Sequence, residues 1–141
     1  MELHERLNTA RIGTSRRELE RLKEFAAAQI KDGRPLIEDP RFRDRLSRVE
    51  IELMALEITN LRFLDQMRGG RPPGAEVSML KITGTEIQQA LTELSMQAAD
   101  PAAQDEYTGL AKRYSNFRKT TIYAGSNEIQ RNIISKMTLG L

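Results

Sequence analysis

Cysteine is absent from the 141-residue sequence, tryptophan is absent too, and histidine occurs once. Without cysteine there can be no disulfide framework and no thiolate site. The single histidine, His4, is the only base that a Ser-His-Asp triad could use, and a di-iron bundle needs paired histidines. The lack of cysteine fits a reducing compartment, so we expect a cytoplasmic protein.

Long hydrophobic runs and clusters of one charge are also missing. No apolar run is long enough to span a bilayer, and residues 1–15 are too mixed and charged for a secretory signal. The 22 basic and 20 acidic residues give a net charge of +2 and are interleaved along most of the chain. A nucleic-acid-binding bundle has only the pI near 9.1 in its favour, because a basic face needs larger clusters than Arg16 with Arg17. We therefore expect no nucleic acid partner and no membrane span.

What the sequence does contain is helical periodicity interrupted by proline and glycine. The pattern predicts helices over about 3–31, 40–68, 75–99, 105–118 and 126–137. Asp39 before Pro40 is predicted to cap the second helix, and Ser126 to cap the last. No stretch alternates apolar and polar residues for long enough to make a convincing strand. Three long and two shorter helices with short connections predict one all-α domain, an antiparallel helical bundle.

Apolar residues at three- or four-residue spacing mark the faces expected in the core. They are Leu19, Leu22, Ala26 and Ile30 in the first helix; Phe42, Leu46, Val49, Leu53 and Leu56 in the second; and Val77, Leu80, Ile87, Leu91, Leu94 and Ala98 in the third. The second helix has a further stripe of Met54, Ile58 and Leu61, which predicts two packing neighbours. Gly84 lies on the third helix's stripe, where its missing side chain would let another helix approach closely.

One segment, residues 121–134, is not typical of a simple bundle. It reads TIYAGSNEIQRNII and places Asn127, Glu128, Gln130 and Arg131 at the entrance of the last helix. Gly125 lets the chain turn there, and the free N–H groups of the helix start could face a polar or anionic ligand. An ordinary capped helix is the other interpretation that these residues allow.

The run IYAGSNEIQRNII, followed by the Leu-Gly-Leu ending at 139–141, resembles the C-terminal signature of acyl-CoA dehydrogenases. In that family a tyrosine, a variable residue, Gly, and Thr or Ser lead into the final helix. The order of the helices fits as well, so the resemblance covers essentially the whole chain. It covers only the last domain of the family's enzyme, and residues 1–141 are therefore expected to be the C-terminal domain of a larger flavoenzyme.

The resemblance implies that the full-length enzyme uses FAD to oxidise an acyl-CoA thioester to the trans-2-enoyl-CoA, in fatty acid or acyl-CoA metabolism. The expected partners are the acyl-CoA substrate, the missing N-terminal and middle domains, further copies in a homo-oligomer, and an electron-transfer flavoprotein. The isolated chain is expected to be inactive and not to retain FAD. The alternative is a non-catalytic helical interaction domain derived from that family.

The resemblance also assigns residues. Many members carry the catalytic glutamate at the variable position, which here is Ala124, and an alanine cannot be the base. Others carry it on the first long helix before an arginine, which makes Glu5 the candidate base and Arg6 a substrate-binding residue. The backbone N–H of Ala124 would stabilise charge on the thioester oxygen, with Tyr123 and Gly125 beside it. The residues matched to FAD binding are Ser126, Asn127 and Glu128, and no metal is expected.

Two family motifs are missing. Family members often have an Arg-x-x-Phe-Gly loop after the first helix that contacts FAD in a neighbouring subunit, but residues 21–26 read RLKEFA and are predicted to be helical. The family's Gln-x-x-Gly-Gly segment is replaced at 96–101 by MQAADP. Both changes predict a divergent branch in which the contacts between subunits and FAD are altered.

Overall fold

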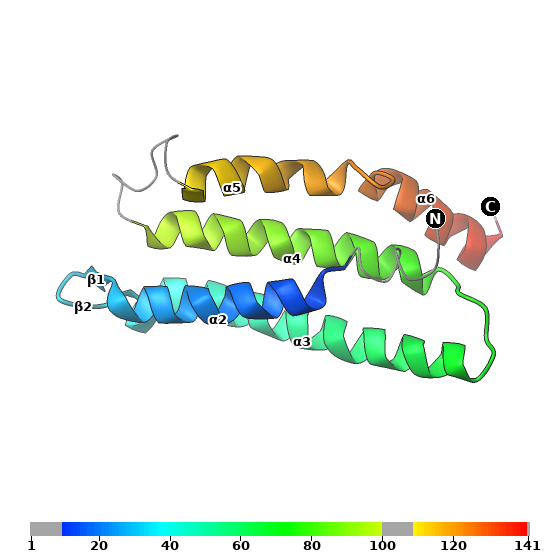
Figure 1. Cartoon of the computed structure of the whole chain (residues 1–141), viewed down its shortest axis with the longest axis horizontal. Helices are drawn as coiled ribbons and strands as arrows, with labels where there is room; N and C mark the ends of the chain where they lie inside the picture. Colours follow the sequence, from blue (N-terminus) through cyan, green and yellow to red (C-terminus); the bar gives the residue numbers. More distant parts are fainter. Residues whose placement is uncertain (1–9, 100–108, 141) are drawn as a thin grey trace.

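The computed structural model describes residues 10–99 and 109–140 of the chain. This part contains five α-helices. They are α2 (Ile12–Ala28), α3 (Pro40–Arg68), α4 (Glu76–Ala98), α5 (Gly109–Phe117) and α6 (Asn127–Leu139). Figure 1 shows that α3 runs antiparallel to both α2 and α4, while α5 and α6 follow each other along another side of α4. The predicted all-α antiparallel bundle is confirmed.

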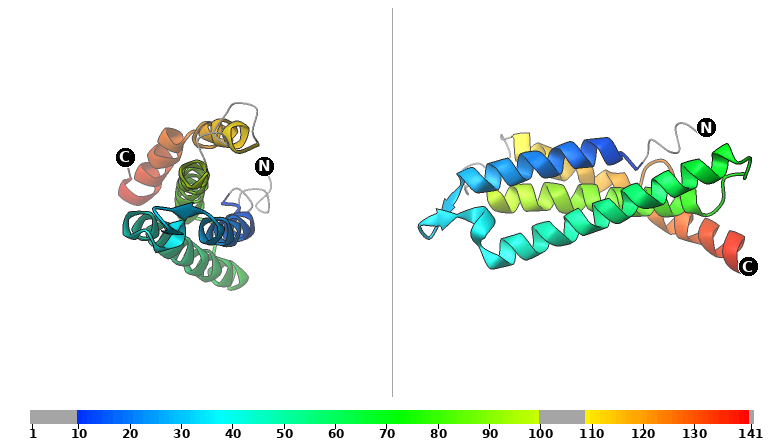
Figure 2. Two further views of the ribbon diagram at one scale, coloured as in Figure 1. Left: turned by 90° about the vertical axis from the view of Figure 1, so that its left-hand side faces the viewer. Right: turned by 90° about the horizontal axis from the view of Figure 1, so that it is seen from below.

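Helix α4 lies at the centre of the bundle. It contacts α2, α3, α5 and α6, and the end view in Figure 2 shows these helices arranged around it. The apolar stripe predicted for this helix is buried at Leu80, Ile87, Leu91, Leu94 and Ala98. Because α4 has neighbours on several sides, it also buries polar residues, and two of these, Lys81 and Thr85, hydrogen-bond to Asn127 at the start of α6.

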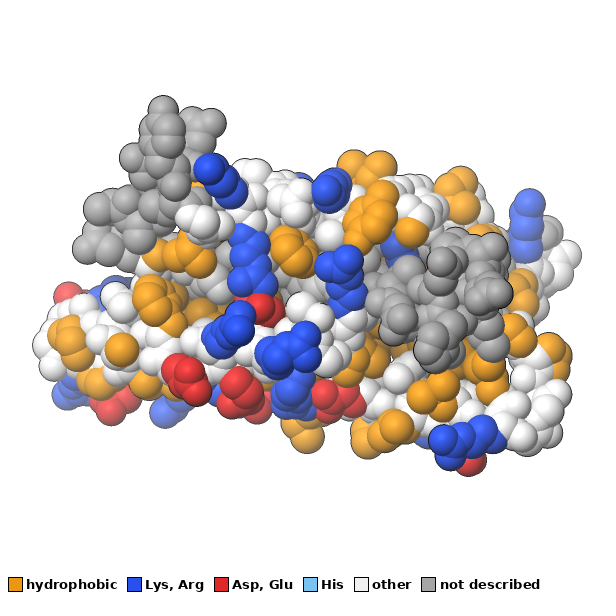
Figure 3. Space-filling model, in the orientation of Figure 1, with side chains coloured by type: hydrophobic (Ala, Val, Ile, Leu, Met, Phe, Trp, Pro, Cys, Tyr) orange, Lys and Arg blue, Asp and Glu red, His pale blue; other side chains and the backbone are white. Residues whose placement is uncertain are grey.

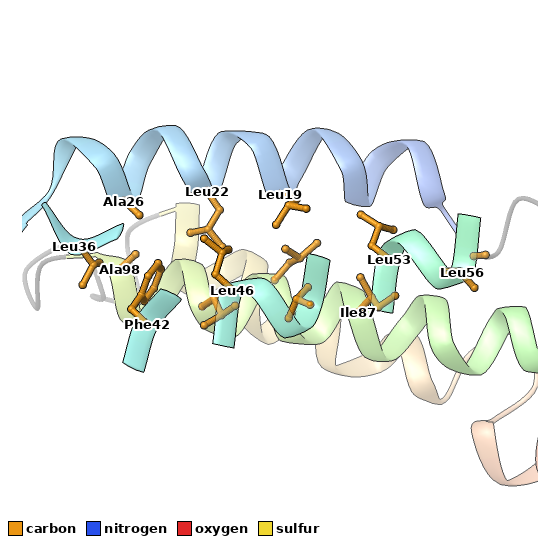
Figure 4. Packing of buried hydrophobic residues seen from close by; sticks show 14 of the residues in the cluster. Leu19, Leu22, Ala26, Leu36, Phe42, Leu46, Leu53, Leu56, Ile87 and Ala98 are labelled. Atoms are coloured by element: carbon orange, nitrogen blue, oxygen red, sulfur yellow. The ribbon is translucent and has the colours of Figure 1, made fainter. Parts of the chain in front are cut away.

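The main hydrophobic core lies between α2, α3 and α4 (Figure 4). Leu19, Leu53 and Ile87 come from the three helices and are completely buried. Full burial of side chains of this size contributes about 1.5–3 kcal/mol each relative to exposure. The stripe predicted for the second helix is buried at Phe42, Leu46, Val49, Leu53 and Leu56, so the periodicity identified the core face of α3 correctly.

The ends of the helices follow from local chemistry. The Asp39 side chain accepts hydrogen bonds from the backbone N–H groups of Arg41 and Phe42 at 2.9 and 3.1 Å, and Pro40 occupies the first helical position. These contacts satisfy two N–H groups that have no partner inside the helix. Both predicted N-caps are confirmed, since the Ser126 hydroxyl accepts from the N–H of Ile129 in α6.

The first helix is shorter than the sequence predicts. Residues 1–9 lie outside the described residues, and α2 begins after Arg11, whose φ of 46° is left-handed and interrupts helical geometry. The helix ends at Ala28 rather than near residue 31. Ile30 therefore does not extend the core stripe, and it is 68% exposed.

A short hairpin replaces the predicted end of that helix. Strands β1 (Ile30–Lys31) and β2 (Arg34–Pro35) pair antiparallel. Asp32 and Gly33, which link them, both have positive φ, 52° and 77°. A two-residue turn with two positive φ angles matches the twist of paired strands, and Asp-Gly favours it strongly. Each strand has only two residues, which is too short to show an alternating pattern.

Two interhelical ion pairs join the outer sides of α2 and α3. Arg16 lies 2.5 Å from Glu57, and Lys23 lies 2.6 Å from Glu50. The hydrogen bonds to these carboxylates raise the pKa of Arg16 and of Lys23, although partial burial acts against the rise. Figure 3 shows acidic and basic side chains next to one another where α2 lies against α3.

The second apolar stripe of α3 has no neighbour in the described part of the chain. Met54, Ile58 and Leu61 are between 53% and 60% exposed. Helix α6 also exposes apolar residues, and hydrophobic side chains gather toward its end of the molecule in Figure 3. Of the helices that the structure describes, α3 and α6 included, none combines the length and the apolar character needed to cross a membrane.

Candidate functional site

The 122–126 turn connects the 3-10 helix η3 (Arg118–Thr121) to α6. It begins where the N–H groups of Ile122 and Tyr123 both donate to the carbonyl of Lys119, at 2.9 and 3.1 Å. Ala124 and Gly125 then adopt left-handed conformations with φ of 57° and 84°. The glycine accepts this geometry easily, whereas a left-handed alanine costs roughly 1–2 kcal/mol.

This conformation leaves backbone N–H groups of the turn without partners among the described residues. No described residue accepts a hydrogen bond from the N–H of Ala124 or of Gly125, and both residues are exposed. Consecutive N–H groups in turns of this kind form concavities that bind anions and polarised oxygens, and the N-terminus of α6 adds its own partial positive charge. The turn can therefore stabilise negative charge on an oxygen placed against it.

The first turn of α6 is capped by its own side chains. The Ser126 hydroxyl accepts from the N–H of Ile129 at 3.3 Å. Hydrogen bonds from the backbone N–H of Glu128 and from the Ser126 hydroxyl lower the pKa of the Glu128 carboxyl, and Arg131 at 3.6 Å also favours the charged form. Glu128 is 76% exposed, so this carboxylate is available at the surface beside the turn.

Asn127 points away from that surface and into the bundle. Its side chain is buried against α4, where Oδ1 accepts a 2.8 Å hydrogen bond from the Nζ of Lys81. Its Nδ2 donates to the Oγ1 of Thr85 at 3.3 Å. In this structure, then, Asn127 joins α6 to α4 while the neighbouring residues of the turn face outward.

A hollow of about 370 Å³ lies beside the turn, between the start of α2 and η3. Its lining residues are Arg11, Asn116, Phe117, Lys119, Thr120 and Tyr123. Two cations and two aromatic rings are present, and none of the six residues is acidic. A ligand with an apolar body and a polar or anionic end suits this lining.

The structure describes some of the predicted site residues and not others. Tyr123, Ala124 and Gly125 form the exposed turn, and Ser126 with Glu128 follows at its edge. Glu5 and Arg6 lie outside the described residues. Among those that are described, no group of three or more potential metal ligands comes together.

Sequence reasoning missed the buried polar pair on α4. Lys81 and Thr85 were not singled out, because a lysine in a helix is usually interpreted as part of a solvated face. The available signal was position: Lys81 and Gly84 are three residues apart, and Gly84 lies on the predicted core stripe. A lysine that falls at the spacing of a buried face needs a partner inside the protein.

The two departures from the family motifs can be located only in part. Residues 21–26 lie within α2, as predicted, so no loop is present there. Residues 96–98 are the last residues of α4 and Ala99 is its C-cap, while 100–101 lie outside the described residues. The helical geometry at 21–26 means that this segment cannot present a glycine-containing loop to a neighbour.

Comparisons with known proteins agree with one another. A family model described as "Acyl-CoA dehydrogenase, C-terminal domain" matches residues 3–139. Acyl-CoA dehydrogenase IpdE1 of Mycobacterium tuberculosis is 33% identical over 108 residues, which are 74% of this chain and 28% of that protein. The chain thus spans a little over a quarter of that curated relative.

Two solved structures share the fold. The crystal structure of an acyl-CoA dehydrogenase from Geobacillus kaustophilus has a TM-score of 0.83 and 25% identity, covering 97% of this chain and 36% of that one. The FAD complex of PigA has a TM-score of 0.80 and 25% identity, covering 92% of this chain and 34% of that one. In both cases the matching region makes up about a third of the solved protein's chain.

Proposed function

Because the chain belongs to the acyl-CoA dehydrogenase family, as its C-terminal domain, we propose that the flavoenzyme containing it oxidises an acyl-CoA thioester to the trans-2-enoyl-CoA. The observation that carries the proposal is the 122–126 turn, where Ala124 is exposed and its N–H has no acceptor among the described residues. A hollow lined by aromatic and basic residues adjoins it.

The chemistry requires a base and a group that stabilises negative charge. The α C–H of a thioester is a weak acid, so its removal leaves charge on the thioester oxygen. In this proposal the N–H of Ala124 donates a hydrogen bond to that oxygen. Glu5 is the base in this proposal, since Ala124 has no carboxylate, and Arg6 supports the site from the same segment.

The described residues are compatible with FAD as one neighbour of the turn. Free N–H groups at a helix start suit the polar edges and phosphates of a cofactor such as FAD. Ser126 and Glu128, which follow the turn in the sequence, add polar side chains beside it. When bound, FAD would supply the acceptor for the hydride that leaves the β-carbon. Asn127 is matched to the cofactor by family resemblance, but its buried side chain supports a role in holding the turn rather than in direct contact.

The wider setting follows from the same proposal. Exposed apolar residues on α3 and α6 support burial against the missing domains and against further copies in a homo-oligomer. An electron-transfer flavoprotein is the proposed acceptor of electrons from the reduced enzyme, and the proposed location is cytoplasmic.

The test is to purify the flavoenzyme in which this chain is the C-terminal domain and mix it anaerobically with a panel of saturated acyl-CoAs. The proposal predicts bound FAD, loss of the visible absorbance of the oxidised flavin, and formation of the 2-enoyl-CoA in equal amount. A protein that binds no flavin, or whose flavin no acyl-CoA in the panel reduces, contradicts it.

A non-catalytic helical interaction domain is the second candidate, and one observation favours it. The segment nearest in sequence to the family's FAD-contacting loop motif, residues 21–26, is part of α2. A relative that had lost its flavin would no longer need that loop. The same purification separates the two candidates, because the second predicts a stable protein without flavin.

A further inference from the structure

Lys81 is a buried ammonium group at the contact between α4 and α6. The residue is 4% exposed, and its Nζ donates to the Oδ1 of Asn127 at 2.8 Å. No described carboxylate lies within ion-pair distance, and Glu128 is the one acidic group whose charge favours the protonated lysine, acting from a greater distance. Burying a charge with so little compensation is unfavourable, so a lysine at this position calls for an explanation other than packing.

The contact is also the main anchor of α6. Asn127 is the first residue of that helix and the only one that is buried within it. Helix α4 is the one helix with which α6 makes extensive contact in the described part of the chain. Thr85 completes the anchor: its hydroxyl accepts a hydrogen bond from the Nδ2 of Asn127 at 3.3 Å and donates to the carbonyl of Ile82 at 2.9 Å.

The position of the anchor matters because Asn127 follows directly on the 122–126 turn. Ala124 lies three residues before it, in a left-handed conformation that the chain does not favour by itself. Fixing both side-chain atoms of Asn127 fixes the start of α6 and, through Ser126 and Gly125, the direction of the Ala124 N–H.

We propose that Lys81 is a positioning residue, which holds Asn127 and thereby the backbone of the 122–126 turn in the geometry that the reaction uses. This inference rests on the proposed function only for its consequence in catalysis. Its structural part concerns this chain alone. Lys81 touches neither substrate nor cofactor in this proposal.

The structural part is tested by hydrogen exchange on the chain, comparing Lys81→Met with the parent. Methionine fills a similar volume and removes both the charge and the bond. We expect the hydrogen-bonded amides at the start of α6, 129–133, to exchange roughly ten- to hundredfold faster, which corresponds to the loss of one hydrogen bond to a charged group. Exchange in α2 and α3 should not change, and overall thermal stability should change little, because removing a buried charge offsets the hydrogen bond that the Oδ1 of Asn127 loses.

Further variants distinguish positioning from general damage. Lys112→Met removes an exposed lysine on α5 and should leave the exchange of 129–133 unaltered. Asn127→Leu should have the effect of Lys81→Met, and the double variant should be no worse than either single variant, because the two residues act through one contact. Asn127→Asp keeps an acceptor for Lys81 and should retain most of the protection. Unchanged exchange in Lys81→Met, or fully additive effects, would overturn the inference.

The consequence for catalysis is tested in the flavoenzyme. Lys81→Met should slow flavin reduction by acyl-CoA about ten- to hundredfold while substrate affinity stays the same. A displaced Ala124 N–H would weaken the hydrogen bond to the thioester oxygen more in the transition state, where that oxygen carries more negative charge, than in the bound substrate. An active parent and an equally active Lys81→Met enzyme would overturn the positioning role. A parent enzyme without any dehydrogenase activity would instead reject the proposed function, and the hydrogen-exchange result would still decide the structural part.

Discussion

At the scale of single residues, Gly84 shows how closely two segments of the bundle approach. A Cβ built at this position would lie 2.7 Å from both the Cα and the carbonyl oxygen of Ala10. Real Cβ atoms do not come so near to backbone, so a side chain here must push the start of α2 away from α4. The sequence predicted a close approach at Gly84, and the structure identifies the neighbour as the turn that precedes α2 rather than a helix.

Gly84→Ala is therefore expected to destabilise the chain by roughly 1–3 kcal/mol, the usual cost of overpacking a well-filled interior. Helix propensity alone would make Gly→Ala stabilising by about 1 kcal/mol. A loss of stability would therefore have to come from the close contact with Ala10. Equilibrium urea unfolding measures the change. Gly109→Ala is a suitable control, because a Cβ at that helical glycine meets no atom within 4 Å. A Gly84→Ala variant as stable as the parent would show that the two segments do not touch.

The candidate site was predictable at some residues and not at others. The turn and the Ser126 cap follow from residue types with strong local preferences, glycine and serine before a helical pattern. Lys81 could not be predicted in the same way, because its role depends on Asn127, which lies 46 residues further along the chain. Only the packing of α6 on α4 brings the two together, and local preferences contain no information about that contact.

At the scale of elements, the accuracy of each predicted boundary depends on the chemistry at that boundary. Helix α3 has the predicted bounds because Asp39 with Pro40 starts it and the glycine pair after Arg68 ends it. Helix α6 extends two residues further than predicted, to the left-handed Gly140. Helix α2 starts after a left-handed Arg11, and an arginine gives no sequence signal for that conformation.

The N-cap of α3 also gives a prediction about pH. Hydrogen bonds from the backbone N–H groups of Phe42 and Arg41 lower the pKa of the Asp39 carboxyl below its ordinary value of 3.8. The folded chain therefore holds fewer protons than the unfolded chain in this pH range. The contribution of Asp39 to stability is complete above about pH 3.8 and decreases as the pH falls through the lower, folded-state pKa.

Asp39→Asn keeps a capping oxygen without the titration, so it serves as the matched comparison. The stability difference between the parent and this variant should be constant near neutral pH and should move in favour of the variant as the pH falls below 3.8. Thermal unfolding at a series of pH values measures it. A difference that stays constant down to the lowest pH would mean that the cap does not depend on the charge.

At the scale of the whole molecule, the uncovered apolar faces predict self-association of the isolated chain. Met54, Ile58 and Leu61 on α3 are more than half exposed, as are Ile129 and Met137 on α6. Contiguous apolar surface of this kind usually marks an interface. Sedimentation velocity should show oligomers at micromolar concentrations, and Ile58→Lys should weaken them. A clean monomer throughout that range would be inconsistent with the proposed burial of these faces in the full enzyme.

The isolated chain is also expected not to retain FAD. It spans only about a third of the relatives that share its fold, so it supplies one part of any flavin site. A few contacts at the 122–126 turn rarely offset the loss of translational and rotational freedom on binding, roughly 4–15 kcal/mol. Purification in the presence of FAD followed by an absorbance spectrum tests this. Near-stoichiometric yellow protein would mean that the chain contains a more complete site than the turn and its hollow.

The measurement that tests the central proposal most directly is single-turnover flavin reduction by acyl-CoA in the full flavoenzyme, comparing the parent with Glu5→Gln. Glutamine keeps the shape and hydrogen-bonding capacity of the side chain but cannot remove a proton. If Glu5 is the base and Ala124 supplies only its N–H, Glu5→Gln should slow reduction by a factor on the order of a hundred to ten thousand while substrate still binds. A Glu5→Gln enzyme that reduces its flavin at the parent rate would contradict the account and place the base in another domain.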